Sequence, residues 1–372
     1  MKRHSVVIAW GITTLVVAAV LVGGLASTQW AGRGTFAAVP GVKGGQEMFG
    51  PYEVDRNWPQ NVLALPGNEA WAWGAGQGVF AESPDRVYLL FRDGVHGLDH
   101  RWEHCLIVVN REGQIIEEWT QWSHLFGRLH FVAVDPWDPE KHVWVVDDAR
   151  HAIFRFTNDG KELVQTIGVP NEYGNDMAHF NRPTFLAFTP DWVFVADGYG
   201  NTRVVKLDKG GNFVATWGQP GAPGGNETRP GYMNKVHGVA VDLERSRVYV
   251  NDRQNNRVQI FDYDGNYQDE WSFGPEPTDI HLIYMGADNV LWAVDRATSK
   301  ILGYNRNGEL IYSWGISGDF PGAFRGVHGI SVDQESNFYV AEVGGRRAQR
   351  FIPREGARTE TMVGKPHYAA WK

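Results

Sequence analysis

Residues 194–218 read FVADGYGNTRVVKLDKGGNFVATWG, and the same pattern returns as VYVNDRQNNRVQIFDYDGNYQDEWS at 248–272 and as LWAVDRATSKILGYNRNGELIYSWG at 291–315. Each unit contains three short runs of β-branched and aromatic residues. In the second and third units an Asp-Gly or Asn-Gly dipeptide, at 264–265 and 307–308, separates the last two runs. Such dipeptides favour two-residue hairpin turns, because those turns require positive φ angles. The repeat therefore predicts consecutive antiparallel strands, and helical periodicity is nearly absent.

A fourth run precedes each unit and completes a set of four strands. These runs begin at His130 (HFVAVD), Pro183 (PTFLAF), His237 (HGVAVD) and His328 (HGISVD). An acidic residue that closes the next strand recurs at intervals of about fifty residues, at Asp147, Asp197, Asp252, Asp295 and Glu342. With the unit VYLLFRDG from Val87, six such sets fill residues 58–372. We therefore predict an all-β, six-bladed β-propeller, in which radial closure protects the edges of the sheets.

Composition limits the partners of the chain. The 372 residues carry a formal net charge of −8 and contain no run rich in Lys or Arg, so nucleic acid is not an expected partner. Cys105 is the single cysteine, which excludes an intramolecular disulfide, and its apolar neighbours predict a core position for it. The core must therefore hold together without covalent links.

The N-terminal segment predicts export. After Lys2 and Arg3, residues 6–26 form an uncharged stretch of 21 residues, long enough to cross a bilayer as a helix. The small residues at 24–26 would also suit signal cleavage, so residues 1–26 are either a signal peptide or a signal-anchor helix. Residues 27–57 are predicted to be a flexible linker. The propeller is expected outside the cytoplasm, in the periplasm or at the extracellular face, secreted or anchored to the membrane.

Three histidines share one phase of the repeat. The first strand of a propeller blade lines the central channel, so residues at its start form a ring at one mouth of the channel. His130, His237 and His328 begin the first strands of the second, fourth and sixth blades and should converge on the axis. Three neutral imidazoles with one open position are the ligand set of a catalytic Zn²⁺. Alternatively, a histidine at a strand entry forms only a hydrogen bond with a neighbouring loop.

Residues that close the second strands point to the same mouth, because neighbouring strands are antiparallel. Arg92, Tyr199 and Arg253 occupy such positions. A nearby metal and a guanidinium would favour the phenolate, which lowers the pKa of Tyr199 and makes it a candidate general base. An arginine can bind a carboxylate bidentately. Each of the three residues also has a purely structural interpretation, and only their combination with the histidines indicates an active site.

The sequence resembles two groups of known proteins. The pattern at Asp197, Asn201 and Arg203 resembles the NHL repeat. Residues 75–352, through VADGYGNTRVV, NDRQNNRVQIF and the three histidines, resemble the peptidyl-α-hydroxyglycine α-amidating lyases, or peptidylamidoglycolate lyases. This resemblance implies an NHL-type six-bladed propeller that binds zinc through His130, His237 and His328. It further implies that Tyr199 is the base, that Arg253 is its charged neighbour and that Arg92 meets the substrate carboxylate.

Two positions depart from that family. Its members use an acidic residue directly after the third histidine for a structural calcium ion, whereas this chain has Gly329, which argues against calcium. Gly326 replaces a methionine that lines the substrate site in the family, which leaves the choice of substrate open.

The sequence thus predicts an exported zinc-dependent lyase that cleaves the C–N bond of an α-hydroxyglycine compound into an amide and glyoxylate. The expected partners are a small molecule or peptide that carries a carboxylate, a separate hydroxylating enzyme that supplies it, and the membrane through the N-terminal segment. The alternative is a non-catalytic, membrane-tethered NHL propeller that binds a protein or glycan and has no need of a metal. A calcium-dependent hydrolase would require carboxylates at the channel mouth, and not imidazoles.

Overall fold

The computed structural model describes residues 47–64, 72–92, 95–96, 105–225 and 227–368. The expected signal peptide or anchor helix, residues 1–26, lies outside these ranges and stays a prediction. No helix within the described ranges is long and apolar enough to cross a membrane. The helical elements described there are short 3-10 turns, η1 (Val62–Ala64), η2 (Thr120–Trp122), η3 (Arg253–Asn255) and η4 (Thr359–Thr361).

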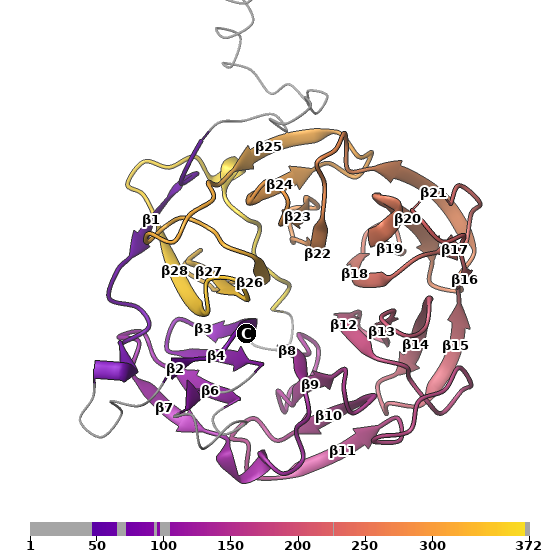
Figure 1. Ribbon diagram of the computed structural model, residues 1–372, viewed down its shortest axis with the longest axis horizontal. Helices are drawn as coiled ribbons and strands as arrows, with labels where there is room; N and C mark the ends of the chain where they lie inside the picture. Colours follow the sequence, from indigo (N-terminus) through magenta and orange to yellow (C-terminus); the bar gives the residue numbers. More distant parts are fainter. Residues whose placement is uncertain (1–46, 65–71, 93–94, 97–104, 226, 369–372) are drawn as a thin grey trace, which may run out of the picture. The chain divides into compact units, whose positions relative to one another are not determined.

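Six four-stranded sheets surround a common axis (Figure 1), which confirms the predicted all-β, six-bladed propeller. The first three blades are β3 (Gly76–Ser83), β4 (Arg86–Phe91), β6 (Leu106–Val109) and β7 (Ile115–Glu118); β8 (Leu129–Val134), β9 (Val143–Asp147), β10 (Ala152–Phe156) and β11 (Leu163–Ile167); and β12 (Pro183–Phe188), β13 (Trp192–Asp197), β14 (Arg203–Asp208) and β15 (Phe213–Trp217). The next two are β18 (Val236–Asp242), β19 (Arg247–Asp252), β20 (Arg257–Asp262) and β21 (Tyr267–Ser272); and β22 (Ile280–Met285), β23 (Leu291–Asp295), β24 (Lys300–Tyr304) and β25 (Leu310–Trp314). Two short ribbons, β2 (Ala72–Trp73) with β5 (Val95–His96) and β16 (Gln219–Pro220) with β17 (Tyr232–Met233), lie outside the blades.

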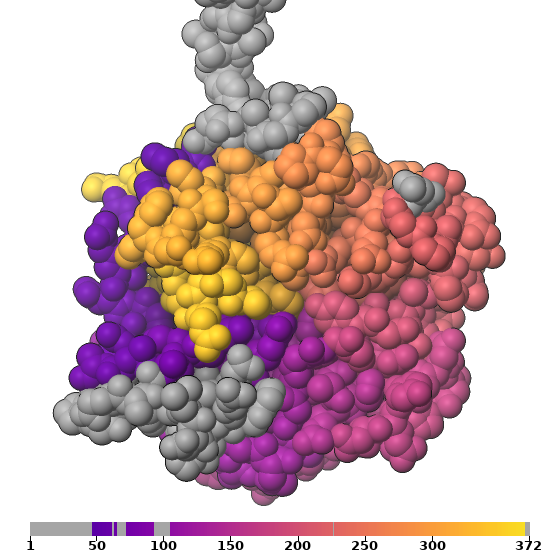
Figure 2. Space-filling view, viewed as in Figure 1, coloured from indigo at the N-terminus to yellow at the C-terminus, as the bar shows by residue number. Residues whose placement is uncertain are grey.

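The sixth blade is closed by a strand from the other end of the chain. It contains β26 (Val327–Val332), β27 (Phe338–Glu342) and β28 (Arg347–Pro353), and β1 (Tyr52–Asp55) pairs antiparallel with β28. Figure 2 shows this last blade, in yellow, beside the indigo first blade. The segment expected as a linker, residues 27–57, therefore contributes the outer strand of a blade. This pairing supplies hydrogen bonds that an exposed edge of β28 would lack.

The hairpin glycines provide space for tryptophans of the preceding blade. Gly265, at φ 84°, lies in the predicted turn between β20 and β21, and a Cβ atom there would come within 2.8 Å of the indole of Trp217. Gly308, at φ 80°, has the same relation to Trp271. The turn residue thus fixes the hairpin and the contact between neighbouring blades at once, which explains why both features recur together.

The repeated acidic residues are buried structural anchors. Asp197 accepts hydrogen bonds from Asn201 Nδ2 (2.7 Å) and from Arg203 Nε (2.9 Å), and Arg203 is itself buried. Arg257 Nε forms the matching contact with Asp252 at 2.8 Å. These arginines are therefore occupied inside their own blades and are not part of a binding surface.

The first strands of the blades, β3, β8, β12, β18, β22 and β26, lie nearest the axis (Figure 1). Away from the histidine end, they enclose an apolar cavity of about 150 Å³ whose wall includes Phe131, Phe185, Leu282 and Ile330. None of the described residues that line this cavity carries a carboxylate. A side chain at Gly329 would also come within 2.9 Å of the main chain of Gly78. The described wall residues therefore supply no carboxylate ligand, and position 329 has no room for an acidic side chain that could bind calcium.

Candidate metal and catalytic site

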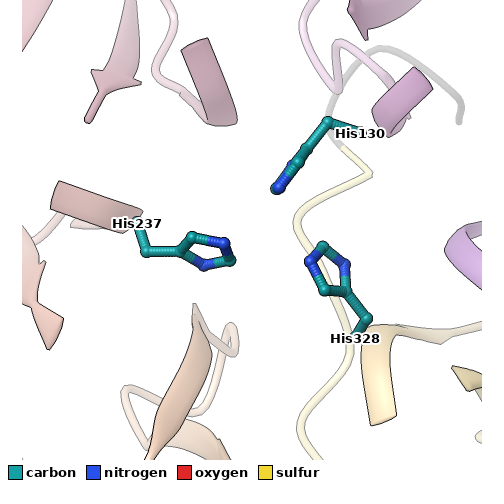
Figure 3. A group of neighbouring side chains, drawn as sticks. All are labelled: His130, His237 and His328. Atoms are coloured by element: carbon teal, nitrogen blue, oxygen red, sulfur yellow. The ribbon is translucent and has the colours of Figure 1, made fainter. Parts of the chain in front are cut away.

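Three histidine side chains point toward a common centre from three sides of the channel (Figure 3). They are the second residues of β8, β18 and β26, namely His130, His237 and His328. Their possible ligand atoms all lie within 4.8 Å of one another, and each side chain is buried. The predicted convergence of histidines from alternate blades is thus observed.

A β-bulge accounts for the direction of these side chains. In each of the six inner strands the pairing register shifts at or next to the second residue, as between Leu129 and Phe131 in β8. A bulge leaves one residue outside the regular ladder and re-aims its side chain. All six second residues therefore form one ring. In chain order they are Gln77, His130, Thr184, His237, His281 and His328.

The Nδ1 atoms of the three histidines are held by the next blade. In each case Nδ1 forms a hydrogen bond with the main-chain carbonyl of the following ring residue. The acceptors are Thr184 for His130 (3.0 Å), His281 for His237, and Gln77 for His328 (2.8 Å). An N–H on Nδ1 leaves Nε2 as the lone-pair donor, and it fixes the orientation of the ring, as in known metal sites. The hydrogen bonds of the alternative interpretation are present, but the Nε2 atoms remain directed at the centre.

The chemistry of this donor set fits a zinc ion. Burial lowers the pKa values of His130 and His237 well below the ordinary value, and it lowers the pKa of His328 to about 3. The imidazoles are therefore neutral, which is the form that binds a metal. Nε2 of His130 is buried and has no hydrogen-bond partner among the described residues. A buried nitrogen without a hydrogen-bond partner, beside two other imidazoles, fits the role of a metal ligand.

Tyr199 lies directly beside the three histidines. It follows β13, and its hydroxyl lies 2.7 Å from Nε2 of His237, with the two rings 4.9 Å apart. Burial raises the pKa of Tyr199 above its ordinary value, and the nearby charge of Arg253 acts in the opposite direction. The expected lowering of this pKa therefore does not arise from the protein's own groups, because the loss of hydration outweighs the guanidinium.

Arg92 is linked to the histidines through one side chain. Its Nη2 donates to Oε1 of Gln77 at 2.8 Å, and the amide nitrogen of Gln77 lies 3.0 Å from Nε2 of His328. Nε of Arg92 is buried without a partner among the described residues. A guanidinium with a free, dehydrated donor close to the imidazoles is well placed to bind an anion.

Arg253 reaches the site from the start of η3. Its Nε donates to Oδ1 of Asp279 at 2.8 Å, and the side chain is 12% exposed. Arg296 Nε donates to the other oxygen of Asp279 at 2.9 Å. Sequence reasoning did not identify Asp279, because it lies in the connection before β22, where no repeated motif marks it.

The rim of this mouth carries excess positive charge, although the whole chain is acidic. Two carboxylates are each shared by two guanidiniums. Asp148 contacts Arg128 and Arg182, and Asp279 contacts Arg253 and Arg296. The ammonium group of Lys235 lies 6.0 Å from the ring centre of Tyr199. Such a rim attracts anionic ligands.

His281 is a functional candidate that sequence reasoning missed. It is the second residue of β22, and its ring lies 5.1 Å from the rings of both His237 and His328. The run HLIYMG lacks the Val-Asp pair that ends the runs beginning at the other three histidines of the ring. Spacing could have found it, since His281 precedes Asp295 by the same interval as His328 precedes Glu342.

Both the backbone conformation and the lack of space disfavour a side chain at position 326. The φ of Gly326, 66°, lies in the left-handed region, which a residue with a side chain rarely adopts. A Cβ atom there would lie 3.0 Å from the main-chain nitrogen of Gly344. The local fold therefore differs from one that presents a methionine to the site.

No protein-family model matches the chain. It is 26% identical over 247 residues to a probable peptidyl-α-hydroxyglycine α-amidating lyase of Caenorhabditis elegans, which covers 64% of this chain and 67% of the relative. It is also 26% identical over 319 residues to NHL repeat-containing protein 3 of Homo sapiens, covering 81% of this chain and 84% of the relative. These relatives bear out the resemblance to amidating lyases and to NHL-repeat proteins.

Larger relatives match over a part of their length. The chain is 28% identical over 240 residues to peptidyl-glycine α-amidating monooxygenase of Mus musculus, which covers 59% of this chain and 23% of the relative. Among solved structures, a gluconolactonase from Xanthomonas campestris superposes with a TM-score of 0.53 at 14% identity, over 83% of this chain and 98% of that structure. At this identity the superposition shows a shared fold and no shared activity.

Proposed function

We propose that this chain is a zinc-dependent lyase that converts an N-acyl-α-hydroxyglycine into an amide and glyoxylate. The observation that carries the proposal is the contact of a phenol with an imidazole of the converging triad, Tyr199 with His237 at 2.7 Å. The similarity to proteins named as amidating lyases supports the broader class, a carbon–nitrogen lyase.

The metal would be held by the Nε2 atoms of His130, His237 and His328. A zinc ion with three imidazole ligands and one open position polarises an oxygen bound there, which makes a hydroxyl group more acidic. The protein's part is to keep these imidazoles neutral, which their burial does, and to fix their orientation through Nδ1. The apolar channel behind them limits the access of water.

Side chains around the three histidines would transfer the proton and bind the carboxylate of the substrate. Tyr199 takes the proton of the substrate hydroxyl as general base. Because burial raises the pKa of its phenol, a bound metal would have to favour the phenolate together with the charge of Arg253. The carbonyl of glyoxylate forms while the C–N bond breaks. The bonding electron pair moves to the amide nitrogen, which takes up the proton that Tyr199 accepted, so that the phenolate is restored and no oxidant or reductant is needed. Arg92 holds the carboxylate through its free donors, which sets the position of the reacting carbon.

The setting of the reaction is part of the proposal. The apolar segment at residues 6–26 supports export, by a cleaved signal or as an anchored protein at the periplasmic or extracellular face. An α-hydroxyglycine compound is formed by oxygenation of a glycine derivative, so the substrate would come from a separate hydroxylating enzyme.

A second candidate is a tethered, non-catalytic NHL propeller that binds a protein or glycan. The similarity to human NHL repeat-containing protein 3, whose name states no catalytic activity, supports it. The two functions differ in their need for a metal, because a binding scaffold has no use for three buried imidazoles that converge on one centre.

The test uses the full chain, purified in detergent and loaded with zinc. We expect about one zinc per chain and release of glyoxylate from α-hydroxyhippurate, both lost in His237→Ala. The matched control is His142→Ala, because His142 lies in the connection between β8 and β9, at the far end of the blade, and contacts Asp138. Equal zinc content in all three proteins, or no glyoxylate from the zinc-loaded parent, would contradict the proposal.

A further inference from the structure

His281 is a buried imidazole that the mechanism above does not use. It is 5% exposed, and neither ring nitrogen has a hydrogen-bond partner among the described residues. Nε2 lies 3.9 Å from Oδ2 of Asp279, which is too far for a hydrogen bond, and that oxygen already accepts from Arg296. Burying an unpaired polar group costs free energy, so such a group inside a site points to a ligand.

His281 is not prepared as a metal ligand in the way that the other three histidines are. Each of those has its Nδ1 held by a carbonyl of the next blade, whereas Nδ1 of His281 has no such contact. Its nitrogens also do not belong to the group of ligand atoms gathered within 4.8 Å. The ring therefore lies next to His237 and His328, but outside the group of ligand atoms that could hold a metal.

Metal-ligand candidates and several other residues of the site come from alternate blades around the axis. The three metal candidates come from the second, fourth and sixth blades. Arg92, Tyr199 and His281 come from the blades between them, the first, the third and the fifth, whereas Arg253 follows β19 of the fourth blade. Tyr199 contacts His237, the Gln77 side chain connects Arg92 to His328, and the ring of His281 lies 5.1 Å from His237 and from His328.

The proposed substrate has three polar substituents on its reacting carbon: a hydroxyl, a carboxylate and an acylamino group. Tyr199 in the third blade is assigned to the hydroxyl, and Arg92 in the first blade is assigned to the carboxylate. The acylamino group is then directed at the fifth blade, where His281 presents its free nitrogens. We propose that His281 is a catalytic residue whose ring N–H donates a hydrogen bond to the carbonyl oxygen of the amide that leaves.

This assignment rests on the proposed lyase function and explains how the leaving group is stabilised. When the C–N bond breaks, its electron pair moves onto the amide nitrogen and is shared with the carbonyl oxygen. A hydrogen bond to that oxygen is stronger in the transition state than in the ground state, which is the condition for catalysis. The proton of His281 stays on the ring, and the amide nitrogen takes up its proton as described above.

The test compares the zinc-loaded parent with His281→Phe and His281→Gln. Phenylalanine keeps a planar ring in the buried position, and glutamine keeps an N–H donor. The control is His367→Phe, the same replacement at the far end of the channel, where His367 lines the apolar cavity. Each protein is assayed with α-hydroxyhippurates that carry electron-withdrawing or electron-donating ring substituents, and zinc content and the melting temperature are measured in parallel.

For His281→Phe we expect kcat to fall by about 10- to 100-fold with unchanged zinc content, the range for one hydrogen bond to a group that gains charge. The rate should also depend more steeply on the ring substituent, since the leaving amide has lost its stabilising contact. Inhibition by the product benzamide should weaken several-fold while inhibition by glyoxylate stays the same. His281→Gln should recover part of the rate, and His367→Phe should match the parent.

If the rate of His281→Phe depends on the ring substituent as steeply as that of the parent, and inhibition by benzamide is unchanged, the role of His281 is overturned while the lyase function stands. A loss of zinc in proportion to the loss of rate overturns it as well and makes His281 a metal ligand. Failure of the zinc-loaded parent to release glyoxylate contradicts the lyase function itself. Should His281→Phe not fold, the inhibition constants of His281→Gln decide, because a flexible amide places its N–H less exactly than the rigid imidazole and should still weaken the binding of benzamide.

Discussion

Replacement of Tyr199 by phenylalanine removes one oxygen atom and leaves the ring in place. The ring packs 5.4 Å from that of His130 and 4.9 Å from that of His237, and the guanidinium of Arg182 lies 4.8 Å above it. These contacts survive in Tyr199→Phe. The lost group is the hydroxyl that lies 2.7 Å from Nε2 of His237.

The structural and catalytic effects of this change differ in size. Loss of one hydrogen bond lowers the free energy of unfolding by about 0.5–1.5 kcal/mol, and the lower cost of burying a ring without a hydroxyl offsets part of it. Loss of a general base lowers the rate by about 10²- to 10⁴-fold, which corresponds to about 2.7–5.5 kcal/mol in the barrier. The expected loss of stability and the expected rise of the barrier do not overlap in size. The variant therefore distinguishes a catalytic base from a residue that only packs.

The assay follows glyoxylate release from α-hydroxyhippurate by the zinc-loaded chain, with metal content and denaturant unfolding measured on the same samples. We expect zinc at the parent level, unfolding within about 1.5 kcal/mol of the parent, and a loss of kcat by two to four orders of magnitude. Turnover at the parental rate would show that Tyr199 is not the base. Loss of zinc together with turnover would instead assign the phenol to the metal site.

Three other changes give separate expectations. Arg92→Gln should lower kcat/KM by about 10- to 100-fold through KM, and a substrate with a carboxamide in place of the carboxylate should not respond; an equal loss with both substrates would contradict carboxylate binding. Gln77→Leu should keep zinc, because the main-chain carbonyl of Gln77 still orients His328, but should raise KM as the guanidinium loses its 2.8 Å contact; zinc titration and steady-state kinetics check this. Gly265→Ala should lower the free energy of unfolding by about 2–4 kcal/mol, because the left-handed backbone and the crowding against Trp217 both oppose a methyl group. Denaturant unfolding at constant zinc measures this last effect, and a change below about 0.5 kcal/mol would argue against the packing described.

Part of the candidate site followed from the repeat. His130, His237 and His328 could be placed in one ring because each begins the first strand of a repeat, and the repeat predicts the order of the strands. The same argument placed Tyr199 and Arg253 at the same mouth. His281 follows from the same spacing, and it was missed because the motif around it is less similar to the others.

Other features of the site depend on contacts between segments that the repeat does not connect. Arg253 is held by Asp279 of the next blade, and Gln77 joins Arg92 to His328 across the closure of the ring. The pKa of Tyr199 also follows from its burial, which outweighs the charge that the sequence suggested. Such balances between hydration and charge depend on depth inside the fold.

The number of blades, the turns between strands and the ring position of three histidines could be obtained from the amino-acid order, since each rests on local chemistry that recurs in every repeat. The closing strand β1 could not, because Tyr52–Asp55 has no repeat motif and finds its partner β28 almost three hundred residues away. The bulges that direct the six ring residues inward also exist only in the folded chain. The same is true of the buried, unpartnered nitrogens of His281, one of these six residues. The physical reason is that periodic hydrophobicity and turn residues act within a few positions, whereas orientation, burial and charge balance are set by neighbours brought together by folding.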